Sequence, residues 1–147
     1  MRSTWAKASV PILITFLLGT FAGQNRSTLQ QLYGSPIDDA YHAPNDLKVS
    51  AQFAVDGGIC EASIEAVRGK MTDKQLDPVL DAIAPSDTRG QHKMDTFLIR
   101  NCLPDFECAG VTSDYKHLRI TKIGNTNAYS SAMIEYRRHG CKALNKQ

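Results

Sequence analysis

The sequence lacks the short motifs that carry most recognisable enzyme chemistry. It contains no Gly-x-Ser-x-Gly nucleophile elbow, no Gly-x-x-x-x-Gly-Lys phosphate loop and no Gly-x-Gly-x-x-Gly dinucleotide fingerprint. Its four histidines never show the spacing of a zinc site, and we interpret each of them as a surface residue: His42, His92, His117 and His139. No catalytic residue is assigned, and no cofactor or metal is predicted.

Long hydrophobic runs are also scarce, and the clearest one lies at the N-terminus. Arg2 and Lys7 precede an apolar stretch over Ala8–Leu18, and Thr20-Phe21-Ala22 then offers small residues at the two positions that a signal peptidase reads. This layout is typical of a secretory signal peptide, with cleavage between Ala22 and Gly23. A retained membrane anchor is the alternative, but a spanning helix needs about 20 apolar residues. We therefore predict export to the periplasm or the exterior, with no membrane segment after cleavage.

Charge of one sign is missing once the signal peptide is removed. The full chain has 17 Lys and Arg against 15 Asp and Glu, and the signal carries Arg2 and Lys7 but no acid, which leaves 15 of each. A neutral chain has no net electrostatic attraction to nucleic acid or to an acidic membrane. The composition therefore argues against a nucleic-acid partner.

Four cysteines lie beyond the signal peptide: Cys60, Cys102, Cys108 and Cys141. An even number of cysteines in an exported protein indicates disulfides, here two. Four cysteines allow three pairings. We expect Cys60 to pair with Cys102, because both lie on or beside predicted core strands, and Cys108 with Cys141. A local bond between Cys102 and Cys108 is the alternative.

The clearest structural pattern is a hairpin that begins at Leu47. Apolar residues alternate with polar ones up to Val55, which is typical of a half-buried strand, and Asp56-Gly57 favours a two-residue type I′ turn. This turn also places Cys60 on the buried face. It predicts five apolar pairs on that face: Val55 with Gly58, Phe53 with Cys60, Ala51 with Ala62, Val49 with Ile64, and Leu47 with Ala66.

A helix is expected after the hairpin. Four apolar residues share one helical face: Leu76, Val79, Leu80 and Ile83. Thr72–Gln75 has the spacing of a capping box, and Pro78 fits best as the first residue of a helix. We therefore predict a tight turn over 73–76 and then a helix over 78–84 capped by Asp77. A shorter helix, capped by Ser27, should precede the hairpin and stop at Gly34.

Further strands are expected over 94–100, 117–123 and 131–137, with an irregular segment over 101–114. The predicted class is α+β, a mainly antiparallel sheet of about five strands with one or two helices packed on one face. The domains are a signal peptide over 1–22, a lead-in segment over 23–46 and a single α+β domain over 47–147.

Two groups of carboxylates are candidates for ligand contact. Asp38 and Asp39 lie beside Tyr41 and His42 in a loop, where a ligand could touch them. The second group shares one face of the predicted helix, which we interpret as a solvated polar face: Asp73, Asp77 and Asp81.

Residues 47–85 resemble the opening of the TonB C-terminal domain, where a strand ending in Val-Asp-x-x-Gly turns into a second strand before an Asp-led helix. The matching residues are Phe53–Gly58, Leu76-Asp77 and Ala82-Ile83. This resemblance implies a periplasmic module that recognises a partner by strand addition at a sheet edge. The four cysteines do not belong to that family's pattern.

The layout of the whole chain also resembles small exported bacterial proteins of unknown function. Those proteins combine a signal peptide with Leu-Tyr-Gly-x-Pro, a hairpin with Cys in its second strand, an Arg-Gly pair and a terminal Cys. The matching residues are Leu32–Pro36, Ile59–Glu61, Arg89-Gly90 and Cys141. This resemblance implies export and brings no particular activity with it.

We therefore expect an exported binding or structural module held by two disulfides. A protein partner could add a strand at a sheet edge, for which 115–123 and 131–138 are the candidates, or contact the loop over 34–46. The alternatives are an exported enzyme with a dispersed hydrolase-like site and a TonB-like periplasmic coupling module.

Overall fold

The computed structural model describes residues 24–103, 106–125 and 128–141, and for residues 98–108 it describes the backbone alone. The signal peptide predicted over 1–22, with its cleavage point at Ala22 and Gly23, lies outside the described residues. In the described part of the chain, no helix has the length and apolar character needed to cross a membrane.

The fold is α+β, built on one antiparallel sheet with two α-helices, α1 (Arg26–Tyr33) and α2 (Asp73–Ile83). Its strands run in the order β1-β2-β3-β7-β6-β5-β4. Their bounds are β1 (Ala40–Ala43), β2 (Leu47–Phe53), β3 (Ile59–Ala66), β4 (His92–Leu103), β5 (Phe106–Tyr115), β6 (Leu118–Asn125) and β7 (Ala128–Tyr136). The predicted class is confirmed, but the sheet has seven strands rather than about five.

The two strands that the sequence did not predict have weak patterns. β1 has four residues between turns, and β5 lies in the segment that we expected to be irregular. β5 contains Gly110 and a run of small polar residues, so its alternation is faint. It forms because ten register pairs with β4 and five with β6 supply partners on both sides.

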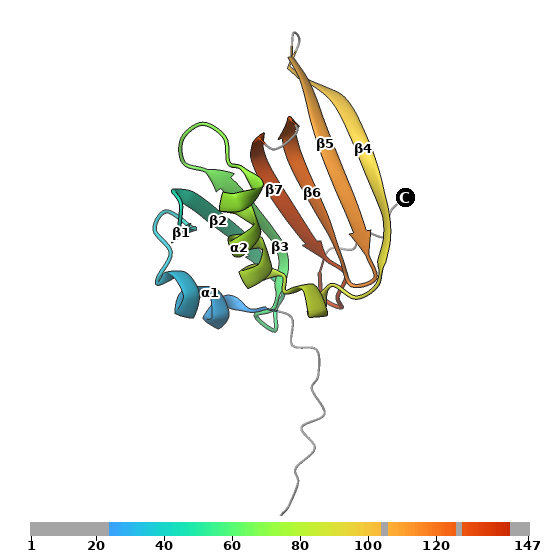
Figure 1. The fold of residues 1–147 in the computed structure, drawn as a ribbon. Coiled ribbons are helices and arrows are strands. Elements are labelled where there is room, and N and C mark those ends of the chain that lie inside the picture. The colour runs from blue at the N-terminus through green and yellow to red at the C-terminus, as the bar shows by residue number, and fades with distance from the viewer. Residues whose placement is uncertain (1–23, 104–105, 126–127, 142–147) are drawn as a thin grey trace, which may run out of the picture.

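The core lies between α2 and one face of the sheet (Figure 1). The predicted apolar face of α2 is confirmed, since its four residues are all buried: Leu76, Val79, Leu80 and Ile83. They join buried side chains of the central strands, such as Val49, Ile64 and Ile134. Leu29 of α1 and Tyr41 of β1 belong to the same core.

α2 is a single helix that contains Pro78, so the predicted break into a turn and a helix capped by Asp77 is wrong. Thr72 is the N-cap, and its N–H donates to Oε1 of Gln75 at 3.0 Å, as the capping-box spacing predicts. An interior proline costs about 3 kcal/mol. Each fully buried Leu, Val or Ile contributes about 1.5–3 kcal/mol, so the four residues on the buried face outweigh the proline.

The register of the β2–β3 hairpin is confirmed for Leu47 with Ala66, Val49 with Ile64 and Ala51 with Ala62. The end of the hairpin differs, because a bulge pairs Phe53 with Ile59 instead of Cys60. The loop is therefore longer than the predicted two-residue turn. Val55 is fully exposed, and Cys60 is half-buried rather than on the buried face.

Contacts around this loop explain the change of register. The Ala54 N–H donates to the Gly58 carbonyl at 2.8 Å, and the Gly58 N–H donates to Oδ1 of Asp56 at 3.0 Å. The lead-in chain binds the outer side of the loop, since the Ile59 N–H donates to the Gln24 carbonyl at 2.9 Å. These partners are a carbonyl 35 residues earlier in the chain and groups of the loop itself, so side-chain alternation could not reveal them.

Two smaller expectations also change. α1 ends before Gly34 as predicted, but its N-cap is Asn25 and not Ser27. Oδ1 of Asn25 accepts a hydrogen bond from the Thr28 N–H at 3.0 Å and one from the Ser27 hydroxyl at 2.6 Å.

A disulfide joins Cys60 at the start of β3 to Cys141, 81 residues further along the chain. The preferred pairing of Cys60 with Cys102 and of Cys108 with Cys141 is therefore wrong, because a cysteine forms one such bond. The predicted pairing assumed that Cys60 lies on the buried face of the hairpin, but the bulge pairs Phe53 with Ile59 and so moves Cys60 off that face. The side chains of Cys102 and Cys108 lie outside the described part of the structure, so the alternative bond between them stays a prediction.

Candidate functional site

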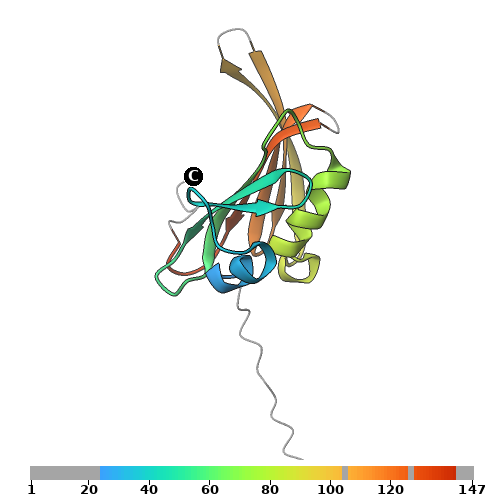
Figure 2. The same ribbon diagram turned by 90° about the vertical axis from the view of Figure 1, so that its left-hand side faces the viewer.

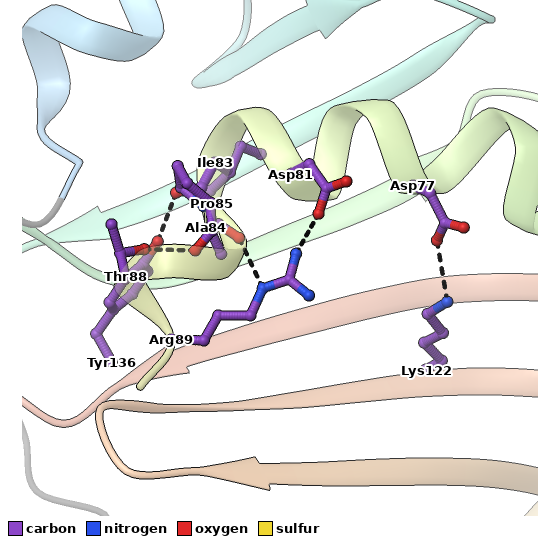
Figure 3. A network of polar contacts seen from close by, with 9 residues as sticks. All are labelled: Asp77, Asp81, Ile83, Ala84, Pro85, Thr88, Arg89, Lys122 and Tyr136. Carbon is purple, nitrogen blue, oxygen red and sulfur yellow. Dashed lines mark hydrogen bonds and ion pairs between the residues drawn. The ribbon is translucent and has the colours of Figure 1, made fainter. Parts of the chain in front are cut away.

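α2 is fixed along β7 by both of its ends. Before the helix, Met71 exchanges two backbone hydrogen bonds of 2.8 Å with Tyr129 at the start of β7. At the other end, the buried Tyr136 hydroxyl donates to the Ile83 carbonyl at 2.6 Å (Figure 3). The helix therefore covers the half of the sheet that contains β2 and β3, and no helix lies in front of β4 and β5 (Figure 1).

A pocket of about 300 Å³ lies at the boundary between the covered and the uncovered half. We call it the α2–β6 pocket. Its walls come from α2, the segment after α2, β5 and β6: Asp77, Leu80, Asp81, Arg89, Val111, Ser113, Tyr115, Ile120 and Lys122. Alternation along β5 and β6 places the strand residues on the helix side of the sheet. The pocket thus combines an apolar floor with charged groups at the helix side.

Arg89 is one of two cations in the pocket. It follows the short 3₁₀ turn η1 (Ser86–Thr88), in which the Thr88 hydroxyl donates to the Pro85 carbonyl at 2.7 Å. Nε of Arg89 donates to the Ala84 carbonyl at 2.8 Å, and Nη2 is paired with Asp81 (Figure 3). Its guanidinium lies 5.9 Å from the ring centre of Tyr115. The side chain is 13% exposed against 62% for Asp81.

Lys122 is the second cation. Its Nζ lies 2.7 Å from Oδ1 of Asp73 and 3.2 Å from Oδ1 of Asp77, and 5.1 Å from the ring centre of Tyr129. Burial disfavours the charge on Lys122, but the hydrogen bonds and charges of Asp73 and Asp77 outweigh burial and raise the pKa of its ammonium. The two ion pairs tie α2 to β6, and Figure 3 shows the one between Lys122 and Asp77.

β4 lies beside the β5 wall of the pocket, with which it pairs. Nε2 of His92 lies 3.0 Å from Oδ1 of Asp95, and its ring packs edge-on against Tyr115 with 5.2 Å between ring centres. Hydrogen bonds from Ser113 and from His92 lower the pKa of the exposed Asp95 carboxyl, despite a small opposing effect of desolvation. Asp95 therefore adds a negative charge beside the pocket.

The loop predicted to carry the Asp38 and Asp39 cluster is a tight turn, and contact of these residues with a ligand stays a prediction. Both residues have positive φ, 49° and 61°, in a tight turn closed by backbone hydrogen bonds between Ile37 and Ala40. Tyr41 is buried in the core and His42 is exposed. Short acidic residues occur here because they tolerate the left-handed backbone conformation of such a turn.

The acidic face of α2 is exposed to solvent as predicted, and its carboxylates also form ion pairs with the sheet and with the segment after α2. Asp73 and Asp77 pair with Lys122, and Asp81 pairs with Arg89. Lys122 and Tyr115 line the pocket but were not predicted as site residues from the sequence. A signal was available, because Lys122 lies two residues after the buried Ile120 and so interrupts the apolar face of β6. Arg89 follows α2 without any pattern that marks it.

The histidines do not come together with an acid pair in the pocket. His42 and His139 are exposed, His117 is half-buried, and His92 lies on β4 beside the pocket wall. The described residues contain no group of three or more His, Cys, Asp or Glu that could hold a metal ion.

The proposed sheet edges are corrected by the strand order. The segments 115–123 and 131–138 contain β6 and β7, which are interior strands, and the two edges are β1 and β4. The prediction failed because β5 was not foreseen and because the segment after α2 crosses to the far side of the sheet. The loop over 34–46 contains β1.

Comparison with known proteins finds no match to this chain among protein-family models, curated sequences or solved structures.

Proposed function

We propose that this chain is an exported binding module whose ligand occupies the α2–β6 pocket. The observation that carries this proposal is the pocket itself, which joins the apolar side chains of Leu80, Val111 and Ile120 to a few oriented polar groups. Pockets with apolar walls and a small number of placed polar groups are typical of small-molecule sites, and about 300 Å³ lies at the lower end of their size range.

The Cys60–Cys141 disulfide supports the exported location, because disulfides persist in oxidising compartments. Its long separation in sequence supports a structural role for the bond, since it closes a large loop of the chain.

The arrangement of polar groups favours binding over hydrolysis. A hydrolytic triad places histidine between the nucleophile and the acid. Beside this pocket the imidazole faces the acid, because Nε2 of His92 lies 3.0 Å from Oδ1 of Asp95, and Ser113 lies opposite Asp95 in the β4–β5 register. The serine–histidine–acid order of a triad is therefore not seen at this position.

The test is a titration of the ¹⁵N-labelled full chain with small aromatic compounds that are cationic, neutral and anionic. Binding in the pocket predicts amide shift changes confined to α2, β5 and β6. The variant Val111→Trp fills the pocket and should abolish these changes. Ser50→Trp, which adds the same ring to an exposed position of β2, is the control and should retain them. Shift changes that survive Val111→Trp would contradict the proposal.

A further inference from the structure

We propose that the α2–β6 pocket selects a small organic amine, a molecule with a cationic group on an aromatic or apolar body. This assignment rests on the proposed function and names the class of ligand. It follows from the charge around the pocket, from the groups that are already engaged there, and from the surface that would receive the body of the ligand.

The charge around the pocket is negative. The lining residues supply the carboxylates of Asp77 and Asp81 and the cations Arg89 and Lys122. Asp73 bonds Lys122 directly, and Asp95 lies opposite Ser113 of the wall in the β4–β5 register, so two further carboxylates lie beside the lining. Four carboxylates therefore face two permanent cations, and this excess favours a cationic ligand.

The two cations are also already paired with carboxylates. Nε and Nη2 of Arg89 are bound to Ala84 and Asp81, and Nζ of Lys122 is bound to Asp73 and Asp77. Both cations are largely covered, with 13% and 22% of their side chains exposed. An anionic ligand would find the remaining hydrogens of these cations only beside the carboxylates that pair with them, which weakens its attraction to either cation.

The carboxylates present their free oxygens to an incoming ligand. The side chains of Asp77 and Asp81 are 53% and 62% exposed, and each makes its ion pair through Oδ1. Because they lie four residues apart on α2, they share one face of the helix at the mouth of the pocket. An ammonium group placed there can bond both carboxylates without breaking the existing ion pairs.

The rest of the pocket suits an apolar or aromatic body. Leu80 and Ile120 are each 4% exposed and form its floor together with Val111. Tyr115 already has the Arg89 guanidinium and the His92 ring packed against it, so its ring is a platform for cationic and aromatic groups. A lysine side chain of a partner protein also carries an ammonium group on an apolar chain. The experiment must therefore distinguish a free small amine from a protein lysine.

The experiment titrates the full chain with three probes that share one phenyl body: 2-phenylethylamine, 2-phenylethanol and 3-phenylpropionate. Amide shifts along α2, β5 and β6 report binding. We expect the amine to bind about tenfold more tightly than the alcohol, because its hydrogen bonds to the carboxylates are charge-assisted. The propionate should bind most weakly. A fourth probe, N-acetyl-lysine amide, carries the ammonium without the ring.

Variants then locate the selectivity. Asp77→Asn and Asp81→Asn should each reduce the affinity for the amine towards that for the alcohol and leave the alcohol unchanged. Asp77→Asn keeps Lys122 paired with Asp73, so the fold is preserved. Asp38→Asn removes a carboxylate in a distant exposed turn and should have no effect.

Each remaining outcome counts against a specific statement. If the alcohol or the propionate binds as tightly as the amine in the pocket, the proposed function stands and the amine class is wrong. If N-acetyl-lysine amide binds more tightly than the amine, the ligand is a protein side chain and not a free small amine. If none of the four probes shifts α2, β5 or β6, the proposed function fails and the ligand class fails with it.

Discussion

A single buried hydroxyl fixes the end of α2 that forms one wall of the pocket. The Tyr136 side chain rises from the end of β7 and donates to the Ile83 carbonyl in the last turn of the helix. Its burial raises the pKa of the phenol far above the usual range, so the hydroxyl stays protonated and remains a donor at physiological pH. The carbonyl at a helix end needs such a partner, because no further turn of helix supplies one.

Tyr136→Phe should therefore lower the free energy of unfolding by about 1–2 kcal/mol, the cost of leaving a buried carbonyl without its donor. The matched control is Tyr129→Phe, whose hydroxyl lies 3.4 Å from Oδ2 of Asp73 in a half-buried position. We expect the control to cost less than about 0.5 kcal/mol. Urea unfolding followed by circular dichroism measures both, and equal losses in the two variants would contradict this role for Tyr136.

A carboxyl on the opposite face of the sheet should control stability in acid. Asp114 on β5 pairs with Arg119 through Nε at 3.1 Å and also with Arg137. Desolvation opposes its charge, but the two guanidinium groups outweigh desolvation and lower the pKa of the Asp114 carboxyl.

The sign of the pH effect follows from that direction. A carboxyl whose pKa is lower in the folded than in the unfolded state adds stability above its unfolded pKa of about 4, and this stability is lost as the pH falls through the folded pKa. Asp114→Asn should therefore be less stable than the wild type at pH 6, and the difference should shrink from about pH 5 downwards. Urea unfolding across this range checks it, with Asp38→Asn as the control. A difference that is constant with pH would refute the assignment.

At the scale of elements, the sequence identifies those in which a local pattern determines the outcome. The apolar face of α2 and most of the β2–β3 register could be predicted, because a period of 3.6 or of 2 is visible in neighbouring residues. The end of that hairpin could not be predicted, because it depends on the backbone carbonyl of Gln24 and on the side-chain carboxylate of Asp56. β5 could not be predicted for a related reason, since its stability comes from pairing with its two neighbouring strands.

The candidate site was predictable only in part. Asp77 and Asp81 were recognised as a shared helix face, but their partners come from two segments whose approach depends on the strand order. Lys122 is 45 residues from Asp77, and no local pattern links the two. A site of this kind emerges when the chain after α2 crosses to β4 and then returns strand by strand to β7.

The β4–β5 hairpin also makes a prediction about the remaining cysteines. With Cys60 bound to Cys141, the other two are Cys102 and Cys108. The register pairs Cys108 with Arg100, so Cys102 lies on the neighbouring strand, two residues along β4 from the position opposite Cys108. We expect a second disulfide between them in the exported protein.

Intact mass with and without reductant tests this expectation, because two bonds make the oxidised chain lighter by four hydrogens. Peptide mapping then assigns the bonds. Cys141→Ser should lower the free energy of unfolding by about 2–5 kcal/mol. Cys108→Ser should cost less, because the loop that its bond closes is far shorter. A mapped bond from Cys60 to Cys102 would contradict the structure, and free thiols at Cys102 and Cys108 would contradict the second bond.

At the scale of the whole molecule, the sheet is covered unevenly. One end is shielded by α1, α2 and the lead-in segment, whereas the β4–β5 hairpin extends past the rest of the molecule (Figure 2). β4 is a twelve-residue edge strand without proline, and its side chains from His92 to Phe97 are all exposed. Phe97 and Met94 are 78% and 56% exposed. Proteins usually protect long edges of this kind, because their free backbone groups can pair with another chain.

We therefore expect the purified protein to self-associate through β4 as its concentration rises. Phe97→Lys should weaken this association, because a charge on an edge strand opposes pairing with a second copy. Val55→Lys is the matched control, since Val55 is equally apolar and fully exposed but lies in the loop between β2 and β3. Sedimentation velocity over a wide concentration range measures the effect.

If Val55→Lys weakens association as much as Phe97→Lys does, general surface hydrophobicity and not the β4 edge is responsible. If the wild type stays monomeric throughout, the charged side chains of Lys93 and Asp95 already protect the edge, and a partner segment would have to overcome the same barrier to add a strand there.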